Sequence, residues 1–319
     1  MGEGDATEGV GNTMTNPSGT NPSGPVDGRT DPDLNVIMSE RRHLINLAYR
    51  LLGSLTDAED VVQETYARWC ALSRRQQEAI ASPGAWLTTV AGRICLDLLG
   101  SARARRERYV GAWIPEPLPE PADDDPADRV TLDESVSMAF LVVLESMTPA
   151  ERVAFVLHDV FRYPFAEVAE IVGRTPAACR QLASSARRRV RASRPPATPA
   201  DRHAGIVRDF KRAWAAKDID ALIGLLDSDA TATGDGGGLA RAELRPVEGA
   251  ERVARFFADR AGAVRDLTIV ECTVNGQPGL VARQDGVTVS VLAFDVTGDK
   301  IKHIWAILNP DKLRHWTTD

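Results

Sequence analysis

The sequence predicts a multidomain protein in which two all-α modules precede an α+β domain. Apolar residues recur at the three- and four-residue spacing of amphipathic helices in two separate stretches, and alternating, strand-like segments follow residue 266. Charge divides the chain in the same way. Residues 41–109 hold 11 basic and 7 acidic residues and residues 136–194 hold nine and five, whereas the segment between, 110–135, holds one basic and eight acidic residues. The expected parts are residues 1–33, 34–110, 111–134, 135–195 and 200–319.

Composition narrows the class of protein. The net charge of −7 counts against nucleic-acid binding for the whole chain, but the two basic modules make the charge of each part more informative. The four cysteines have neither metal-ligand spacing nor the number of a disulfide scaffold, which fits a reducing cytoplasm. We expect no membrane segment and no signal peptide. Residues 1–33 are nearly devoid of apolar side chains and twice repeat Thr-Asn-Pro-Ser-Gly, so we expect a disordered tail.

The first module is predicted to begin with a helix whose apolar residues run from Leu44 to Leu52 and which ends at Gly53. Thr56 and Glu59 form a capping-box pattern, so a second helix is expected to start at Thr56. Its core-facing side chains are expected to be Ala58, Val61, Val62, Thr65 and Trp69. The opposite side is mostly acidic, and we call the following residues the acidic ridge: Asp57, Glu59, Asp60, Gln63 and Glu64. Such a ridge is either a solvated helix face or a binding surface.

A third helix is predicted to start at Ser82-Pro83, with serine as the cap and proline at the first helical position. Its apolar side chains run from Trp86 to Leu99. Its other face and its end hold Thr88, Thr89, Arg93, Arg103, Arg105, Arg106 and Arg108. Arginines with hydroxyls and an aromatic ring suit a phosphate backbone and unstacked bases. The alternative is a solvated basic end, since helix C-termini favour arginine for dipole reasons alone.

The connector between the modules combines proline with acidic residues. Five prolines between Pro115 and Pro126 exclude a helix and predict extended chain. Trp113 precedes them, and a free linker has no reason to expose a tryptophan. We therefore expect Trp113 to pack on a folded surface, the alternative being a simple spacer.

The second module is predicted to contain helices over 132–147, 150–161 and 165–172, and a last helix that starts at Thr175-Pro176. The last helix is expected to bury Ala178, Leu182, Ala186 and Val190. Its outer face holds Ala177, Arg180, Gln181, Ser184, Arg187, Arg188 and Arg191. A short helix, a glycine turn and a capped helix with Arg and Gln outward predict a helix-turn-helix that reads DNA, rather than an ordinary helical hairpin.

The C-terminal part is predicted to hold helices over 203–217, 218–226 and 250–261, followed by strands over 267–274, 279–283, 287–296 and 300–308. Apolar and polar residues alternate in these strands, and Gly and Asp-Gly turns separate them, which indicates a curved antiparallel sheet. Because the helices precede the strands, we expect an α+β fold. His303, Trp305 and Asp235 are candidate pocket residues, although a histidine in a strand is more often structural or exposed.

Several of these motifs resemble a known family. Asp57–Thr65 resembles the core-polymerase-binding helix of bacterial sigma region two, and Ala85–Arg93 with Asp97 resembles the promoter-melting helix that follows it. Residues 164–191 resemble the region-four helix-turn-helix. Only the acidic connector joins the two modules, so region three is missing. This layout is similar to that of the extracytoplasmic-function sigma factors.

Three further motifs are similar to the hallmarks of a subgroup with a fused SnoaL-like C-terminal domain, which has a cone-shaped α+β fold. They are Trp113-Ile-Pro-Glu-Pro117, Asp235-Gly-Gly-Gly238 and Asn309-Pro-Asp-Lys312. Two positions depart from the subgroup: Leu239 stands where lysine usually continues the glycine motif, and Ser185 stands where arginine is common. These departures concern regulation and DNA contact.

The resemblance implies a factor that binds core RNA polymerase, through its β′ and β subunits, and promoter DNA. It implies core-polymerase contacts at Asp57, Glu59, Asp60, Gln63 and Glu64. DNA contacts are implied at Trp86, Thr89, Arg93, Arg103, Thr175, Ala177, Arg180, Gln181, Ser184, Arg187 and Arg188. Regulatory contacts are implied at Trp113, Pro115, Glu116, Pro117, Asp235, Gly236, Gly237, Gly238, Asn309, Pro310, Asp311 and Lys312.

We expect the regulatory motifs to meet, with the glycines allowing close backbone approach and Trp113 filling an apolar recess, so that the cone holds the two modules in a compact arrangement. No catalysis, cofactor or metal is expected, while a small-molecule ligand of the C-terminal domain is left open. Two other functions are considered. One is a DNA-binding repressor or activator, which the acidic ridge disfavours because DNA would repel it. The other is a bifunctional protein with a C-terminal enzyme.

Overall fold

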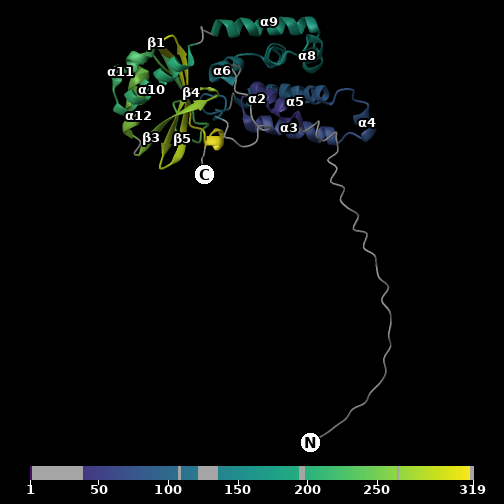
Figure 1. Ribbon diagram of the computed structural model, residues 1–319, viewed down its shortest axis with the longest axis horizontal. Helices are drawn as coiled ribbons and strands as arrows, with labels where there is room; N and C mark the ends of the chain where they lie inside the picture. The colour runs from purple at the N-terminus through teal and green to yellow at the C-terminus, as the bar shows by residue number, and fades with distance from the viewer. Residues whose placement is uncertain (2–38, 107–108, 121–135, 194–197, 264–265, 317–319) are drawn as a thin grey trace.

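Two helical modules and a C-terminal α+β domain pack side by side, with helices α10, α11 and α12 on the side of the sheet away from the modules (Figure 1). The computed structural model describes residue 1 and residues 39–106, 109–120, 136–193, 198–263 and 266–316. The expected tail and the acidic half of the connector lie outside these residues.

The first module comprises α2 (Arg41–Leu52), α3 (Leu55–Cys70), α4 (Arg74–Glu78) and α5 (Pro83–Arg106). Gly53 ends α2 in the left-handed region, at φ +68°, as its position in the sequence predicts. The predicted capping box at Thr56 is wrong. Ser54 is the N-cap of α3 and accepts a hydrogen bond from the Asp57 amide, so the helix starts one residue earlier and leaves Glu59 exposed. The short polar helix α4 was not predicted.

The second module comprises α6 (Met138–Glu145), α7 (Pro149–Phe155), a π-helical turn (Val156–Val160), α8 (Phe165–Val172) and α9 (Pro176–Ser193). Thr148 and Glu151 form a capping box before α7, and Gly173 ends α8 in the left-handed region. The buried stripe of α9 differs from the prediction. It runs through Cys179, Ala183 and Ala186, while Ala178, Leu182 and Val190 are only half-buried beside it, because the helix turns a different edge toward α7.

The two modules share one apolar core, to which α2, α3 and α5 contribute together with α6, α7, α8 and α9. A buried arginine crosses between them. Arg152 of α7 donates to the carbonyl of Leu51 at 2.9 Å and to Glu145 at 2.7 Å. Its Nε has no hydrogen-bond partner among the described residues, so the two bonds made by Nη1 offset the cost of burying the guanidinium, and one of them holds the second module to the first.

The C-terminal domain comprises α10 (Ala200–Ala216), α11 (Ile219–Leu225), β1 (Leu226–Asp235), β2 (Val247–Glu248), α12 (Ala250–Ala263), β3 (Leu267–Val274), β4 (Gln277–Gln284), β5 (Val287–Thr297) and β6 (Lys300–Ile307). The sheet order is β2-β1-β6-β5-β4-β3. β1 pairs in parallel with β6, with Thr231 opposite His303, so the sheet is mixed and the predicted antiparallel sheet is wrong at this pair. The error arises because β1, rich in Asp, Ser, Thr and Ala, was not predicted as a strand. Two 3₁₀ turns, Pro310–Lys312 and Arg314–Trp316, follow β6.

Both faces of this sheet are covered. On one face, α10, α11 and α12 enclose an apolar core in which the rings of Phe210, Trp214, Phe257 and Phe294 pack against one another. The other face meets the connector and α6, and its apolar cluster includes Ile114, Met138, Trp305, Ile307 and Trp316. The sheet is therefore the docking surface through which the C-terminal domain meets the rest of the chain.

Candidate functional site

The acidic ridge lies on the solvent side of α3. Glu59, Asp60, Gln63 and Glu64 are exposed and Asp57 is half-buried, whereas Ala58, Val61, Val62, Thr65 and Trp69 are buried as predicted. Glu64 pairs with Arg68 at 2.8 Å, but both side chains are about half-exposed, so solvent screens the pair and leaves most of the ridge negative.

The start of α3 is held by the connector. Glu116 accepts a hydrogen bond from the Leu55 amide at 2.8 Å, and its own amide donates to the carbonyl of Gly53 at 2.7 Å. The side chain is buried, and this desolvation raises the pKa of Glu116 although the amide bond opposes the change. The connector therefore fixes the first turn of the helix that carries the acidic ridge.

The candidate DNA residues of α5 differ in their accessibility. Trp86 is half-buried and meets Trp69 edge-to-face at 5.2 Å between ring centroids. The hydroxyl of Thr89 donates to the carbonyl of Ala85 at 2.8 Å. Arg93 is exposed and donates to the carbonyl of Glu170, on α8 of the second module, at 3.0 Å. The backbone of Arg103 continues α5, and its side chain lies outside the described structure.

The contact between α5 and α8 is close and includes polar groups. A Cβ atom added at Gly92 would lie 2.8 Å from the Cγ2 of Ile171, so only glycine allows this approach. Nearby, the hydroxyl of Tyr163 lies 3.2 Å from the Thr88 hydroxyl and 2.9 Å from the Nε2 of His43. Burial lowers the pKa of His43, which favours its neutral form at this contact. The helix that resembles the promoter-melting helix thus packs against the helix-turn-helix.

The candidate DNA residues of α9 lie on its outer face. Thr175 caps the helix and accepts from the Ala178 amide at 3.2 Å. Ala177, Arg180, Gln181, Ser184 and Arg188 are exposed. Arg187 differs from these because it is half-buried and pairs with Asp159, on the π-helical turn, at 2.5 Å. Ser185 is half-buried and hydrogen-bonds Glu151. This inward contact suits a short polar side chain such as serine at position 185 better than the longer arginine.

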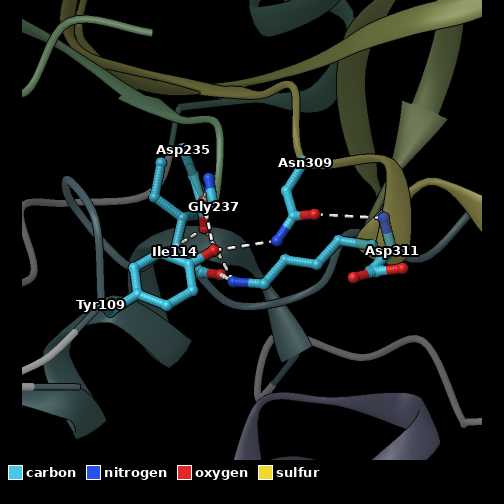
Figure 2. Close-up of polar contacts among 7 residues, drawn as sticks. Tyr109, Ile114, Asp235, Gly237, Asn309 and Asp311 are labelled. Atoms are coloured by element: carbon cyan, nitrogen blue, oxygen red, sulfur yellow. Dashed lines mark hydrogen bonds and ion pairs between the residues drawn. The ribbon is translucent and has the colours of Figure 1, made fainter. Parts of the chain in front are cut away.

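The three regulatory motifs meet around Asp235, which is fully buried (Figure 2). One carboxylate oxygen of Asp235 accepts from the Tyr109 hydroxyl at 2.6 Å and from the Gly237 amide at 3.1 Å. The other accepts from the Ile114 amide at 2.9 Å and from the ammonium of Lys312 at 2.7 Å. We call these residues, with Asn309 and Trp113, the interdomain hub. It joins the connector to the carboxyl ends of β1 and β6, which the parallel pairing places side by side.

The remaining hub contacts explain the glycine and asparagine positions. Asn309 donates to the Tyr109 hydroxyl at 2.9 Å and accepts from the Asp311 amide at 3.1 Å. A Cβ atom on Gly237, whose φ is +60°, would lie 2.4 Å from the side-chain nitrogen of Asn309. The close approach expected at the glycines is therefore present. Pro310 opens the turn that presents Lys312.

Trp113 packs between two parts of the chain. The ammonium of Lys312 lies 4.1 Å from the centre of its ring, and a Cβ atom on Gly53 would lie 2.9 Å from its ring edge. Gly53, between α2 and α3, thus makes room for the ring of Trp113, which we expected to pack on a folded surface. Beyond it, Ile114 is buried, and the carbonyl of Pro117 accepts from the indole of Trp316 at 2.9 Å.

Two residues that join distant parts of the chain, one in the interdomain hub and one outside it, were missed by the sequence analysis. Tyr109 ends the basic run of the first module, and nothing in its local sequence marks it. Asn275 is fully buried, and its side chain bonds the Tyr49 hydroxyl at 2.8 Å, the Val136 carbonyl at 2.9 Å and the Leu118 amide at 3.0 Å. The Asn275-Gly276 pair predicts a two-residue hairpin turn, but sequence alone does not show that the turn joins three parts of the chain.

The candidate pocket residues do not form a pocket. Asp235 belongs to the interdomain hub, and Trp305 lies in the apolar cluster against the connector and α6. His303 stacks on Trp305 and pairs with Asp295 at 3.2 Å. Among the described residues, no group of three or more His, Cys, Asp or Glu side chains could hold a metal ion. None of the described helices is long and apolar enough to cross a membrane.

Comparison with known proteins gives two family matches and several full-length relatives. The Sigma-70 region 2 model matches residues 36–105, and the Sigma-70, region 4 model matches residues 137–190. The chain is 42% identical over 288 residues to the ECF RNA polymerase sigma factor SigJ of Mycobacterium tuberculosis, covering 86% of this chain and 90% of that protein. It is 36% identical over 287 residues to the probable ECF RNA polymerase sigma factor SigI of the same species, covering 89% and 95%.

The solved structures include a similar chain. The crystal structure of the Mycobacterium tuberculosis extracytoplasmic function sigma factor SigJ aligns with a TM-score of 0.70 at 39% identity, covering 88% of this chain and 98% of that chain. The similarity therefore includes the C-terminal domain as well as the two helical modules.

Proposed function

This chain belongs to the extracytoplasmic-function RNA polymerase sigma factors and directs the polymerase to promoters, and we propose how its parts divide that work. Residues 34–110 act as region two, which binds core enzyme and opens the minus-10 element. Residues 135–195 act as region four, which reads the minus-35 element. Residues 200–319 regulate both through residues 111–134. The factor works in the cytoplasm.

The acidic ridge is the proposed polymerase contact. Glu59, Asp60, Gln63 and Glu64 are exposed on one side of a helix whose other side is buried, so they are free to meet a basic surface. The core enzyme is contacted through its β′ and β subunits. On α9, Arg180, Gln181 and Arg188 are exposed, which supports the proposal that the first two read base edges and the third holds phosphate.

One observation carries the regulatory part of the proposal: Arg93 of α5 is hydrogen-bonded to α8. Promoter elements centred about 25 base pairs apart are separated by roughly 85 Å of B-DNA at ~3.4 Å per base pair. Helices in van der Waals contact do not span that distance. The arrangement is therefore a closed state that does not engage both elements, and polymerase binding shifts the population toward an open state.

The interdomain hub stabilises this closed state. Its polar contacts join the connector to β1 and to the turn after β6, while Glu116 and Trp113 join the connector to the first module. Arg152 and the α5–α8 contact then join the first module to the second. Separating the modules requires some of these contacts to break.

The filled interior of the C-terminal domain favours a regulatory role for this domain over an enzymatic one. Its interior holds the rings of Phe210, Trp214, Phe257 and Phe294, where an enzyme of this shape would need an open cavity. We therefore propose that the chain is not an enzyme.

Run-off transcription with purified core polymerase and a promoter from the gene's own neighbourhood tests the proposal. The wild-type factor should yield transcripts, and Asp60→Arg with Glu64→Arg should yield none. Asp235→Asn with Lys312→Met, which loosens the interdomain hub, should raise the yield when core enzyme is limiting. The same yield for this hub variant and wild type would contradict the regulatory role while leaving the sigma activity intact.

A further inference from the structure

The first residue of α8 touches the helix that is proposed to read DNA. The guanidinium carbon of Arg180, on α9, lies over the ring of Phe165 at 5.5 Å from the ring centre. Arg180 is exposed, whereas Phe165 is half-buried and packs against the shared apolar core. Because both residues belong to the helix-turn-helix, the contact moves with the second module and does not depend on the closed state.

Arg180 has no acidic neighbour on its own helix. The residues one turn before and one turn after it on α9 are Pro176, Ala177, Ala183 and Ser184. An unsupported arginine side chain samples many rotamers, and fixing one of them when DNA binds costs entropy. A contact that restricts Arg180 before DNA arrives removes part of this cost.

The ring of Phe165 is itself held in place. It stacks on the imidazole of His158, with 3.8 Å between the ring centroids and 24° between the planes. The Nδ1 of His158 in turn lies 2.8 Å from the carbonyl oxygen of Tyr163, within hydrogen-bond distance. The π-helical turn before α8 therefore supports the ring on which Arg180 lies, and a supported ring restricts Arg180 more than a mobile one would.

The ring contact differs from an ion pair in what it leaves free. Arg187, on the same helix, pairs with Asp159 through its Nε, so that donor is occupied. A ring attracts a guanidinium through its π electrons and occupies none of the five N–H donors. Arg180 can therefore lie on Phe165 and still present two parallel donors to the O6 and N7 of a guanine.

We propose that Phe165 is a positioning residue for promoter recognition: its ring holds the guanidinium of Arg180 in the orientation that reads one guanine of the minus-35 element. The inference rests on the proposed function, in which Arg180 reads base edges. A cation–π contact at an exposed site corresponds to a roughly two- to fivefold effect on an equilibrium constant. The effect should fall on the single base pair that Arg180 contacts.

The test is selection of promoters by the holoenzyme formed from core polymerase and the full chain. The library is a set of promoters randomised over the minus-35 element, and bound sequences are counted. Arg180→Ala identifies its base pair as the position where preference falls by roughly 5- to 150-fold. Phe165→Leu should lower the preference at this same position about two- to fivefold and leave the other positions unchanged. Relative counts do not depend on the fraction of the variant that folds.

Three further variants separate positioning from a structural role. Phe165→Tyr keeps the aromatic ring and should retain the wild-type preference. Phe161→Leu is the matched control, because Phe161 also lies under an arginine, Arg50 of α2, but at the contact between the modules. It should leave the base preference unchanged. In an Arg180→Ala background, Phe165→Leu should have no further effect at the identified base pair.

The outcomes distinguish this inference from the proposed function. Preference lost in Arg180→Ala but unchanged in Phe165→Leu would overturn the positioning role alone. A loss in Phe165→Leu at a different base pair, or one that persists in the Arg180→Ala background, would show that Phe165 acts without Arg180 and would also overturn it. If Arg180→Ala changes no position, the base-reading role of Arg180 fails, and this inference fails with it.

Discussion

Breaking the ion pair of the interdomain hub should cost far more than breaking a surface pair on the same turn. Asp235 is fully buried and Lys312 is 8% exposed, and their 2.7 Å contact is shielded from water. Removing one partner of a buried pair typically costs about 3–5 kcal/mol. In Lys312→Met, three donors to Asp235 remain, namely the Tyr109 hydroxyl and the amides of Ile114 and Gly237. These lower the expected cost to about 2–3 kcal/mol.

A double-mutant cycle isolates the pair. Asp235→Asn, Lys312→Met and the double variant are unfolded with denaturant, and unfolding is followed by the fluorescence of the six tryptophans, which include Trp113 beside Lys312. The double variant should be less destabilised than the sum of the singles, with a coupling of about 2 kcal/mol. The control is Arg314→Met, whose pair with Asp311 is at least 60% exposed on both sides and should cost under about 0.5 kcal/mol. A coupling below about 0.5 kcal/mol, the upper limit expected for the cost of the control variant, would refute the reasoning.

Three further predictions concern the polymerase, the promoter and pH. Asp60→Arg with Glu64→Arg should abolish binding to core enzyme in a pull-down while leaving the thermal unfolding midpoint nearly unchanged, because both side chains face water; wild-type affinity would end this assignment. Arg180→Ala should cost roughly 1–3 kcal/mol and relax the base preference, while Arg188→Ala should weaken all sequences evenly and reduce the salt slope by about one; identical binding-site selection profiles would contradict the division. Burial raises the pKa of Glu116, so the folded state holds its proton longer than the unfolded state, and stability falls as pH rises from the ordinary carboxyl range through the raised pKa. Glu116→Gln should flatten this part of the stability–pH curve, and an unchanged curve would show that another group causes it.

Local sequence signals predicted most of the helices. Gly53 and Gly173 mark helix ends that need a left-handed backbone, which glycine adopts freely. The start of α3 was misplaced because the amide of Leu55 is satisfied by Glu116, 61 residues away, and no local pattern shows such a partner. The strand β1 was missed for a related reason: it is polar and small, and it is defined by its parallel pairing with β6.

The interdomain hub was predicted in outline but not in content. Nothing in the neighbouring sequence explains a tryptophan at position 113 of a linker, three adjacent glycines or an Asn-Pro turn, so each indicated a contact with a distant part of the chain. The structure brings all three together around Asp235 and Lys312. Tyr109 and Asn275 carry equally important bonds, but their sequence neighbourhoods are ordinary. The packing of Arg93 on α8 was likewise unpredictable, since it depends on how two modules meet.

The central claim is that the free protein holds its two helical modules in a closed state that the promoter complex must open. Labels at the exposed Cys70 on α3 and at Ser184→Cys on the exposed face of α9 report the distance between them. Cys95 and Cys179 are buried, and burial raises the pKa of both thiols, so they should stay unlabelled, and only Cys272 needs replacement by serine. The account predicts one short distance distribution for the free protein and an increase of tens of ångströms in the complex with core polymerase and promoter, where the two elements lie roughly 85 Å apart. The same distribution in both states would contradict it.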